Sequence, residues 1–226
     1  MKHTMALAGA WLLLLSHGAQ AQSGETYQPS GLRPFIGVGF TSGGDTLIPV
    51  TLTPEGSTVQ YREHVSSGGG LDLRVGVSRR LGTLPLSLQV AGAYHNDQVN
   101  GIKGEKVRFR RMPIEATLMW HATDRTRIGF GVRKATHPVF KADNVTCGTE
   151  SGATVNCSGK ATLKSNVGVI LEAEYALTPG WGLKARYVWE SYRIKQATPA
   201  WIPGIVEQEE KFEANHLGLL SVWYFD

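Results

Sequence analysis

The sequence predicts an all-β protein: a closed, antiparallel up-and-down transmembrane β-barrel of about eight strands, with long extracellular loops and short periplasmic turns. Apolar and polar residues alternate with period two in repeated segments of about 9–11 residues, the strand length that crosses a bilayer at a tilt. The connections between these segments alternate between long and short. After the N-terminal segment, no apolar run approaches the roughly 18 residues of a transmembrane helix.

The N-terminal segment of the 226-residue chain has the pattern of a secretory signal peptide. Lys2 and His3 form a short basic start, and the apolar run ALAGAWLLLL follows at residues 6–15. The small-x-small sequence AQA then ends at Ala21, so we predict cleavage after this residue. Residues 1–21 are expected to be the signal peptide and residues 22–226 the barrel domain. An uncleaved N-terminal anchor helix is the alternative.

The alternating segments define the predicted strands in chain order. They centre on residues 36–40, 71–77, 86–94, 112–120, 128–132, 167–175, 183–189 and 217–225. The fourth segment is irregular, because Val107 and Phe109 are out of phase with Met112 and Ile114. We therefore expect a bulge near residues 110–111, and the adjacent proline at 113, which cannot donate a ladder hydrogen bond, supports local disruption.

The connections follow the pattern of a transmembrane barrel. Long or medium loops are expected at residues 42–69, 96–106, 136–161 and 194–212, and short turns at residues 79–85, 121–126 and 177–181. Because long and short connections alternate, all long connections are expected at one end of the barrel.

The polar face of the predicted strands carries charges of both signs among glycines. An eight-stranded lumen is narrow enough to be filled by side chains, and an unpaired charge there would be costly. We therefore expect the charges to pair across the lumen. The predicted lumen network consists of Asp72, Arg74, Glu115, Arg133, Glu172, Glu174, Lys184, Arg186 and Glu190.

The apolar face is expected to contact lipid rather than to enclose a ligand, as it would in a soluble lipocalin-like barrel. Aromatic residues lie near the ends of the apolar rows, as they do at membrane interfaces. The predicted aromatic girdle consists of Trp120, Tyr175, Trp181, Trp189, Trp223 and Phe225.

The two cysteines of the chain, Cys147 and Cys157, lie in a predicted loop rich in Gly, Ser, Thr and Asn. An exported protein enters an oxidising compartment, so we predict a disulfide between them. Too few further ligands lie nearby for a metal site, and no cofactor is expected. The acidic loop around Glu207, Glu209 and Glu210 is interpreted as a solvated loop.

The export signal, the alternating strands and the tail HLGLLSVWYF at residues 216–225 resemble the small outer-membrane barrels of Gram-negative bacteria. The opacity proteins and the transmembrane domain of outer-membrane protein A form the group that the chain resembles. The resemblance implies location in the bacterial outer membrane, with outer-membrane lipid, lipopolysaccharide and the barrel-assembly machinery as partners. It also implies roles in adhesion, envelope integrity or host interaction, and some such barrels pass small solutes.

The favoured function is a barrel with a charge-paired, plugged lumen that displays surface loops to an unknown extracellular partner. One alternative is a narrow porin-like channel for small solutes or ions. The second is an outer-membrane enzyme that acts at the outer rim, where His95 and Asp97 are expected as a solvated loop end. Lipid A deacylases carry His-x-Ser near the C-terminus, but the stretch at His216 continues with Leu217 and Gly218, so no catalytic residue is assigned. Interleaved acids and bases give no support for nucleic-acid binding.

Overall fold

The computed structural model describes residues 31–52, 61–100, 106–148, 154–198 and 211–225. Within these ranges, no helix is long and apolar enough to cross a membrane. The described strands are β1 (Leu32–Gly43), β2 (Thr46–Leu52), β3 (Tyr61–Ser66), β4 (Gly70–Arg80), β5 (Leu86–Asn100), β6 (Lys106–His121), β7 (Thr126–Gly148), β8 (Thr154–Ser165), β9 (Gly168–Thr178), β10 (Trp181–Trp189), β11 (Ser191–Thr198), β12 (Lys211–Glu213) and β13 (His216–Tyr224).

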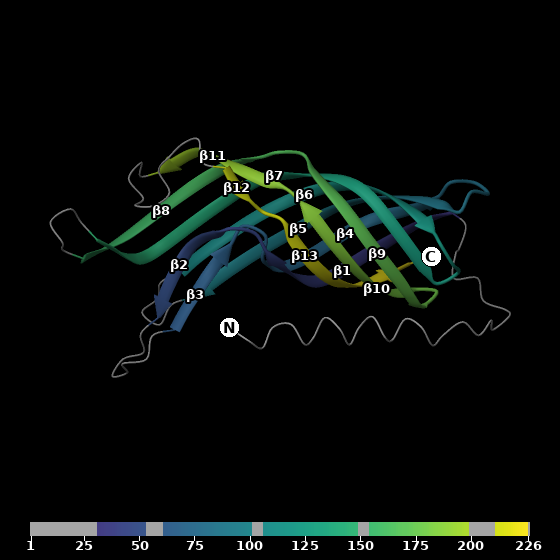
Figure 1. The fold of residues 1–226 in the computed structure, drawn as a ribbon, viewed down its shortest axis with the longest axis horizontal. Helices are drawn as coiled ribbons and strands as arrows, with labels where there is room; N and C mark the ends of the chain where they lie inside the picture. Colours follow the sequence, from purple (N-terminus) through teal and green to yellow (C-terminus); the bar gives the residue numbers. More distant parts are fainter. Residues whose placement is uncertain (1–30, 53–60, 101–105, 149–153, 199–210, 226) are drawn as a thin grey trace.

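Eight of these strands close into an antiparallel barrel. The pairings run in the order β7-β6-β5-β4-β1-β13-β10-β9 (Figure 1). The ring closes because β9 also pairs with residues 126–133, the first part of β7. The first and last of the barrel strands, β1 and β13, are neighbours, with Phe35 opposite Tyr224 and Gly43 opposite His216. The predicted all-β fold and its closed eight-stranded architecture are confirmed.

The remaining strands extend the wall at the end that carries the long connections. The second part of β7, residues 139–148, pairs with β8 instead of β9. In turn, β8 pairs with β11, and β11 pairs with β12 (Figure 1). The hairpin of β2 and β3 lies within the connection from β1 to β4. The segments predicted as long loops therefore contain much additional strand. The prediction erred because these segments lack the alternation of a lipid-facing strand.

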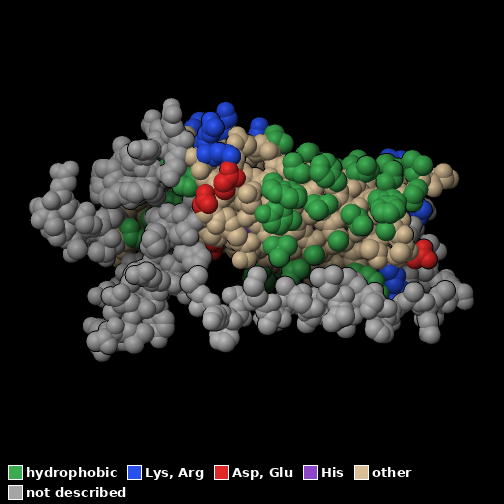
Figure 2. Space-filling model, in the orientation of Figure 1, with side chains coloured by type: hydrophobic (Ala, Val, Ile, Leu, Met, Phe, Trp, Pro, Cys, Tyr) green, Lys and Arg blue, Asp and Glu red, His purple; other side chains and the backbone are tan. Residues whose placement is uncertain are grey.

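Alternation sets the two faces of the barrel wall. In β1, Phe40 is 70% exposed on the outer face, whereas Phe35 is 2% exposed on the inner face. Exposed hydrophobic side chains come from all eight ring strands, and on the visible face they cover the middle of the barrel while charged side chains gather toward its ends (Figure 2). An outer face of this composition is stable only in contact with lipid or another apolar phase.

The predicted irregularity in β6 has a different origin from the one expected. Inward and outward positions alternate through the whole of β6, so Val107 and Phe109 point inward in phase with Glu115. The register shift does lie between Arg110 and Met112, but the extra residue belongs to β7. There His137 has a φ of 50°, in the left-handed region. The change of phase in the sequence therefore marks a reversal of the apolar face, from outward in the barrel to inward beyond it.

Candidate functional site

Glu115 on β6 is the centre of the charged lumen. Its carboxylate lies 3.0 Å from Nη1 of Arg74 on β4, 3.2 Å from Nη1 of Arg133 on β7 and 3.0 Å from Nη2 of Arg186 on β10. All four side chains are buried. The three guanidinium groups come from different sides of the ring, so this one carboxylate joins strands that do not pair with each other.

Above this centre, toward the long connections, the network continues through His95. Its Nε2 lies 2.8 Å from Oδ2 of Asp72, and its Nδ1 lies 3.0 Å from Nη2 of Arg111, which can only donate. Both contacts are satisfied when the imidazole is neutral and carries its proton on Nε2. Arg111 also donates to the carbonyl oxygen of Ser67, and thereby ties the connection between β3 and β4 to the lumen. Oε2 of Glu190 lies 3.1 Å from Nε of Arg133, and the two side chains form a buried ion pair.

Toward the short turns, the network follows β9 and β10. Nζ of Lys184 lies 2.7 Å from Oε1 of Glu172 and 3.4 Å from Oε2 of Glu174. The Tyr224 hydroxyl donates to Glu174 at 2.8 Å, and Arg127 pairs with the same carboxylate. On the backbone, Lys184 stands opposite Glu174 and Arg186 opposite Glu172, so the closest contact of Lys184, to Glu172, is a diagonal one.

Glycines on the inner face make room for these long side chains. A Cβ atom at Gly37 would lie 2.7 Å from Cγ of Arg74, and one at Gly129 would lie 2.8 Å from Cγ of Glu172. Both distances are shorter than a carbon–carbon contact allows, so a larger residue would displace the charged side chain. The lumen is therefore tightly filled at these levels.

The structure brings all nine residues of the predicted lumen network together inside the barrel, and each is buried. It adds Arg111 and Arg127, which bring the described network to five carboxylates and six cationic side chains. Sequence reasoning placed Arg111 at a bulge and assigned Arg127 no role. Strict counting by twos along β6 from Glu115 would have placed Arg111 inside.

Apolar groups complete the filling of the barrel, a feature that the sequence analysis missed. Beyond the charges, toward the long connections, the inner faces of the extended strands form one apolar cluster. It consists of Val65, Val107, Phe109, Ala135, Phe140, Ala142, Ala161, Leu163, Tyr192, Ile194 and Ala214. A smaller cluster toward the short turns consists of Phe35, Ala91, Leu220, Val222 and Tyr224.

The prediction of a solvated rim at His95 is wrong. The His95 side chain is 0% exposed and lies within hydrogen-bonding distance of both Asp72 and Arg111. Asp97, by contrast, accepts a hydrogen bond from the backbone N–H of Ser66, the last residue of β3, at 2.8 Å. The two residues thus lie in different environments, since His95 is part of the lumen and Asp97 holds the β3 connection.

The other predicted residues divide between described and undescribed parts. Four members of the predicted girdle, Trp120, Trp181, Trp189 and Phe225, are exposed on the outer face, while Tyr175 and Trp223 are half-buried. On the backbone, Cys147 stands opposite Val155 and Cys157 opposite Val145, so the two cysteines occupy diagonal positions on neighbouring strands.

The signal peptide and Glu207, Glu209 and Glu210 lie outside the described residues. Within the described ranges, no group of three or more His, Cys, Asp or Glu side chains is arranged to hold a metal ion.

The geometry defines a class of protein, a small transmembrane β-barrel with a lipid-facing exterior and a filled lumen. No protein-family model matches the chain, and no curated protein matches it in sequence. Solved structures of small outer-membrane barrels do match. The attachment invasion locus protein Ail of Yersinia pestis, solved with the heparin analogue sucrose octasulfate, is 9% identical at a TM-score of 0.45, over 85% of this chain and 97% of that chain. Neisserial surface protein A is 13% identical at a TM-score of 0.44, over 87% and 98%. AlkL, solved in lipid bilayers, is 14% identical at a TM-score of 0.43, over 92% and 96%.

Proposed function

We propose that this chain is an exported protein of the bacterial outer membrane that displays its extended strands and long connections at the cell surface. In this role the barrel is an anchor, and the part beyond it contacts an extracellular partner in adhesion, envelope integrity or host interaction. The apolar outer face supports membrane insertion. Export also requires a leader, and residues 1–21 with cleavage after Ala21 remain the proposed signal peptide. Lipopolysaccharide and the barrel-assembly machinery are the proposed envelope partners.

The filled lumen is the observation that carries this proposal. The network from Arg127 through Glu172 and Glu115 to Asp72 occupies the interior, and the apolar cluster around Phe109 covers it toward the long connections. A solute would have to break several buried ion pairs and then cross an apolar layer. An eight-stranded wall leaves little space once its interior side chains are in place.

An ion channel is the second candidate, and the charged lumen favours it over an enzyme. An outer-rim enzyme would need an accessible general base, whereas the His95 side chain is buried between Asp72 and Arg111. A channel would need the network to open transiently. The two candidates differ in what the lumen charges do, because they stabilise an anchor but select ions in a channel.

Planar-bilayer conductance of the refolded protein separates these candidates. The wild-type barrel should show no steady conductance, and Glu172→Ala or Arg186→Ala should lower the unfolding temperature because each leaves an unpaired buried charge. Glu213→Ala serves as the control, since Glu213 forms an exposed pair with Lys211 outside the lumen. Steady wild-type conductance whose ion selectivity changes in the lumen variants, at unchanged unfolding temperature, would establish the channel and overturn the anchor.

A further inference from the structure

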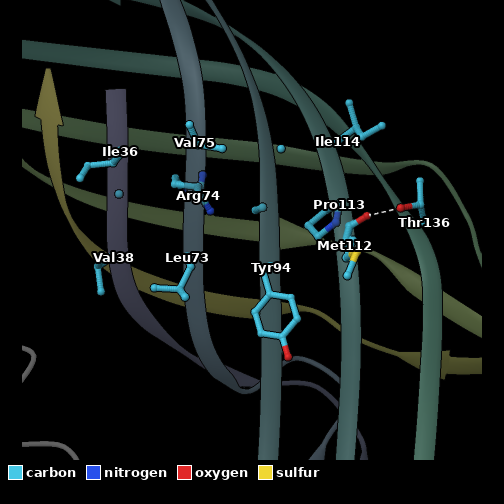
Figure 3. A pocket seen from close by; sticks show the side chains of 13 residues that line it. Ile36, Val38, Leu73, Arg74, Val75, Tyr94, Met112, Pro113, Ile114 and Thr136 are labelled. Carbon is cyan, nitrogen blue, oxygen red and sulfur yellow. Dashed lines mark hydrogen bonds between the residues drawn. The ribbon is translucent and has the colours of Figure 1, made fainter. Parts of the chain in front are cut away.

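A groove crosses the lipid-facing wall at β4, β5 and β6. Val75, Gly92 and Ile114 stand side by side on these strands, and the outer two are 63% and 60% exposed. Gly92 contributes no side chain between them, and a Cβ atom added there would meet nothing within 4 Å. The resulting notch is part of a groove of about 520 Å³ in the apolar surface, which Ile36 and Val38 of β1 also line (Figure 3).

The groove extends along the strands because the ladder between β5 and β6 is interrupted next to it. Pairing passes from Gly92 and Ile114 directly to His95 and Arg111. Pro113 lies in the interval and cannot donate a backbone hydrogen bond. Tyr94 and Met112 line this stretch, and their side chains lie along the groove in Figure 3. An elongated apolar group could therefore lie along the strands here.

Cations border the groove on the side of β6 and β7. Lys134 stands opposite Ile114 in the same cross-strand row and is exposed on the outer face. Arg110 precedes Met112 by two residues on the outer face of β6 and is also exposed. A strand rises about 3.4 Å per residue and neighbouring strands lie about 4.8 Å apart. Both charges are therefore within reach of a headgroup whose chain occupies the groove.

More cations continue this surface away from the barrel. Arg108, Lys141 and Lys160 stand opposite one another on β6, β7 and β8, all on the face opposite the buried apolar cluster. Like charges placed directly opposite destabilise a sheet. Within the described part of the chain, the ion pair formed on this row joins Lys141 to Asp143 at 2.9 Å. A bound anion would offset the remaining repulsion.

We propose that this groove and its cations form a binding site for a phosphate-bearing, acylated lipid of the outer leaflet. One acyl chain lies between Val75 and Ile114 over Gly92, and a phosphate binds to Lys134 and Arg110. The site combines two features that a lipid requires together, an apolar slot in the lipid-facing wall and positive charge at the edge of that wall. A soluble polyanion would use the charges but not the slot. The inference rests on the proposed membrane placement and does not depend on whether the lumen conducts.

The experiment measures lipid retention by native mass spectrometry of the refolded protein in detergent micelles. The probes are lipid A, the same lipid without its phosphates, and phosphatidylcholine. Lys134→Gln and Arg110→Gln should each lower the affinity for lipid A about fivefold, as expected when one cation near an anionic headgroup contributes about 1 kcal/mol. Neither should change the affinity for phosphatidylcholine. Gly92→Leu fills the groove and should weaken both forms of lipid A several-fold.

Two matched controls keep the result interpretable. Arg79→Gln removes an exposed outward charge at the short-turn end, and Ala173→Leu enlarges an exposed outward residue of β9, away from the groove. Both should bind lipid A as the wild type does, and all variants should keep the heat-sensitive gel mobility of a folded barrel. Equal losses in the controls, or lipid A affinities within twofold of wild type in Lys134→Gln and Arg110→Gln, would overturn the site. So would binding of a soluble sulfated polysaccharide that depends on the same cations when lipid A does not bind.

Discussion

A single buried carboxylate can hold several strands of this barrel together. Glu115 faces guanidinium groups from β4, β7 and β10, and of these three strands only β7 pairs directly with β6. Ion pairs of this kind add little net stability compared with apolar packing, but removal of one member leaves the others without compensation. At the scale of the residue, the lumen charges therefore specify which arrangement of the ring is tolerated.

Glu115→Gln is expected to destabilise the barrel by about 3–5 kcal/mol, because it leaves the charges of Arg74, Arg133 and Arg186 with too few acceptors. Urea unfolding in liposomes, followed by tryptophan fluorescence, measures the loss. Glu213→Gln is the control and should change stability by less than about 1 kcal/mol, since its pair with Lys211 is exposed. Equal stability of Glu115→Gln and wild type would mean that the network relaxes around a neutral side chain.

At the scale of the element, β6 and β7 each pass from a lipid environment in the barrel to an aqueous environment beyond it. In the barrel their outward residues, such as Ile114 and Phe130, contact lipid. Beyond the barrel their inward residues, such as Phe109 and Phe140, form the apolar cluster, and the outward positions carry cations. Alternation is unbroken along β6 while the buried and apolar face changes sides. The part of each strand near the short turns is therefore a membrane strand, and the part near the long connections is a strand of a domain in water.

Phe109→Ala should destabilise the extension and leave the barrel in place. Loss of a buried phenyl ring costs about 3–5 kcal/mol where the cavity cannot collapse. Hydrogen exchange of the amides of β8 and β11 should accelerate strongly, with little change in β9 and β10. Phe130→Ala is the matched control, because Phe130 is 62% exposed to the outside of the barrel. Acceleration throughout the molecule would show that extension and barrel unfold together.

Cys147 and Cys157 are expected to be bonded in the exported protein, across the hairpin of β7 and β8. The bridge would contribute at most about 2–3 kcal/mol, and mainly to the order of this hairpin, because the enclosed loop is short. Mass spectrometry of unreduced proteolytic peptides detects the bond directly. Recovery of two free thiols from protein isolated without reductant would refute the prediction.

At the scale of the whole molecule, closure distinguishes this protein from an open sheet. β9 pairs with β7 rather than with the intervening β8, so the ring closes while β8, β11 and β12 continue beyond it. Each strand of the ring thereby has a partner strand on both sides, as a lipid environment requires. The closed ring and the filled lumen make one cooperative body, to which the extended strands are attached.

A closed ring of this kind should resist detergent at room temperature. We expect the protein to fractionate with the outer membrane and to migrate faster on gels before heating than after it, since the folded barrel is more compact than the unfolded chain. A fully denatured sample supplies the reference mobility. Recovery as a soluble periplasmic protein, or identical mobility with and without heating, would contradict both membrane insertion and barrel stability.

The sequence by itself determined the number of barrel strands, their order and nine of the charged residues that face the lumen, because period-two alternation is a local property of each segment. The pairing of Lys184 with Glu174 and of Arg186 with Glu172 follows from the tight turn between adjacent strands, which sets their register. Only the tertiary structure decided how distant strands meet. The position of Glu115 among three arginines, the burial of His95, and the groove over Gly92 depend on the register around the whole ring and on the choice of β9 as the partner of β7. These relations join residues far apart in the chain, and no local pattern encodes them.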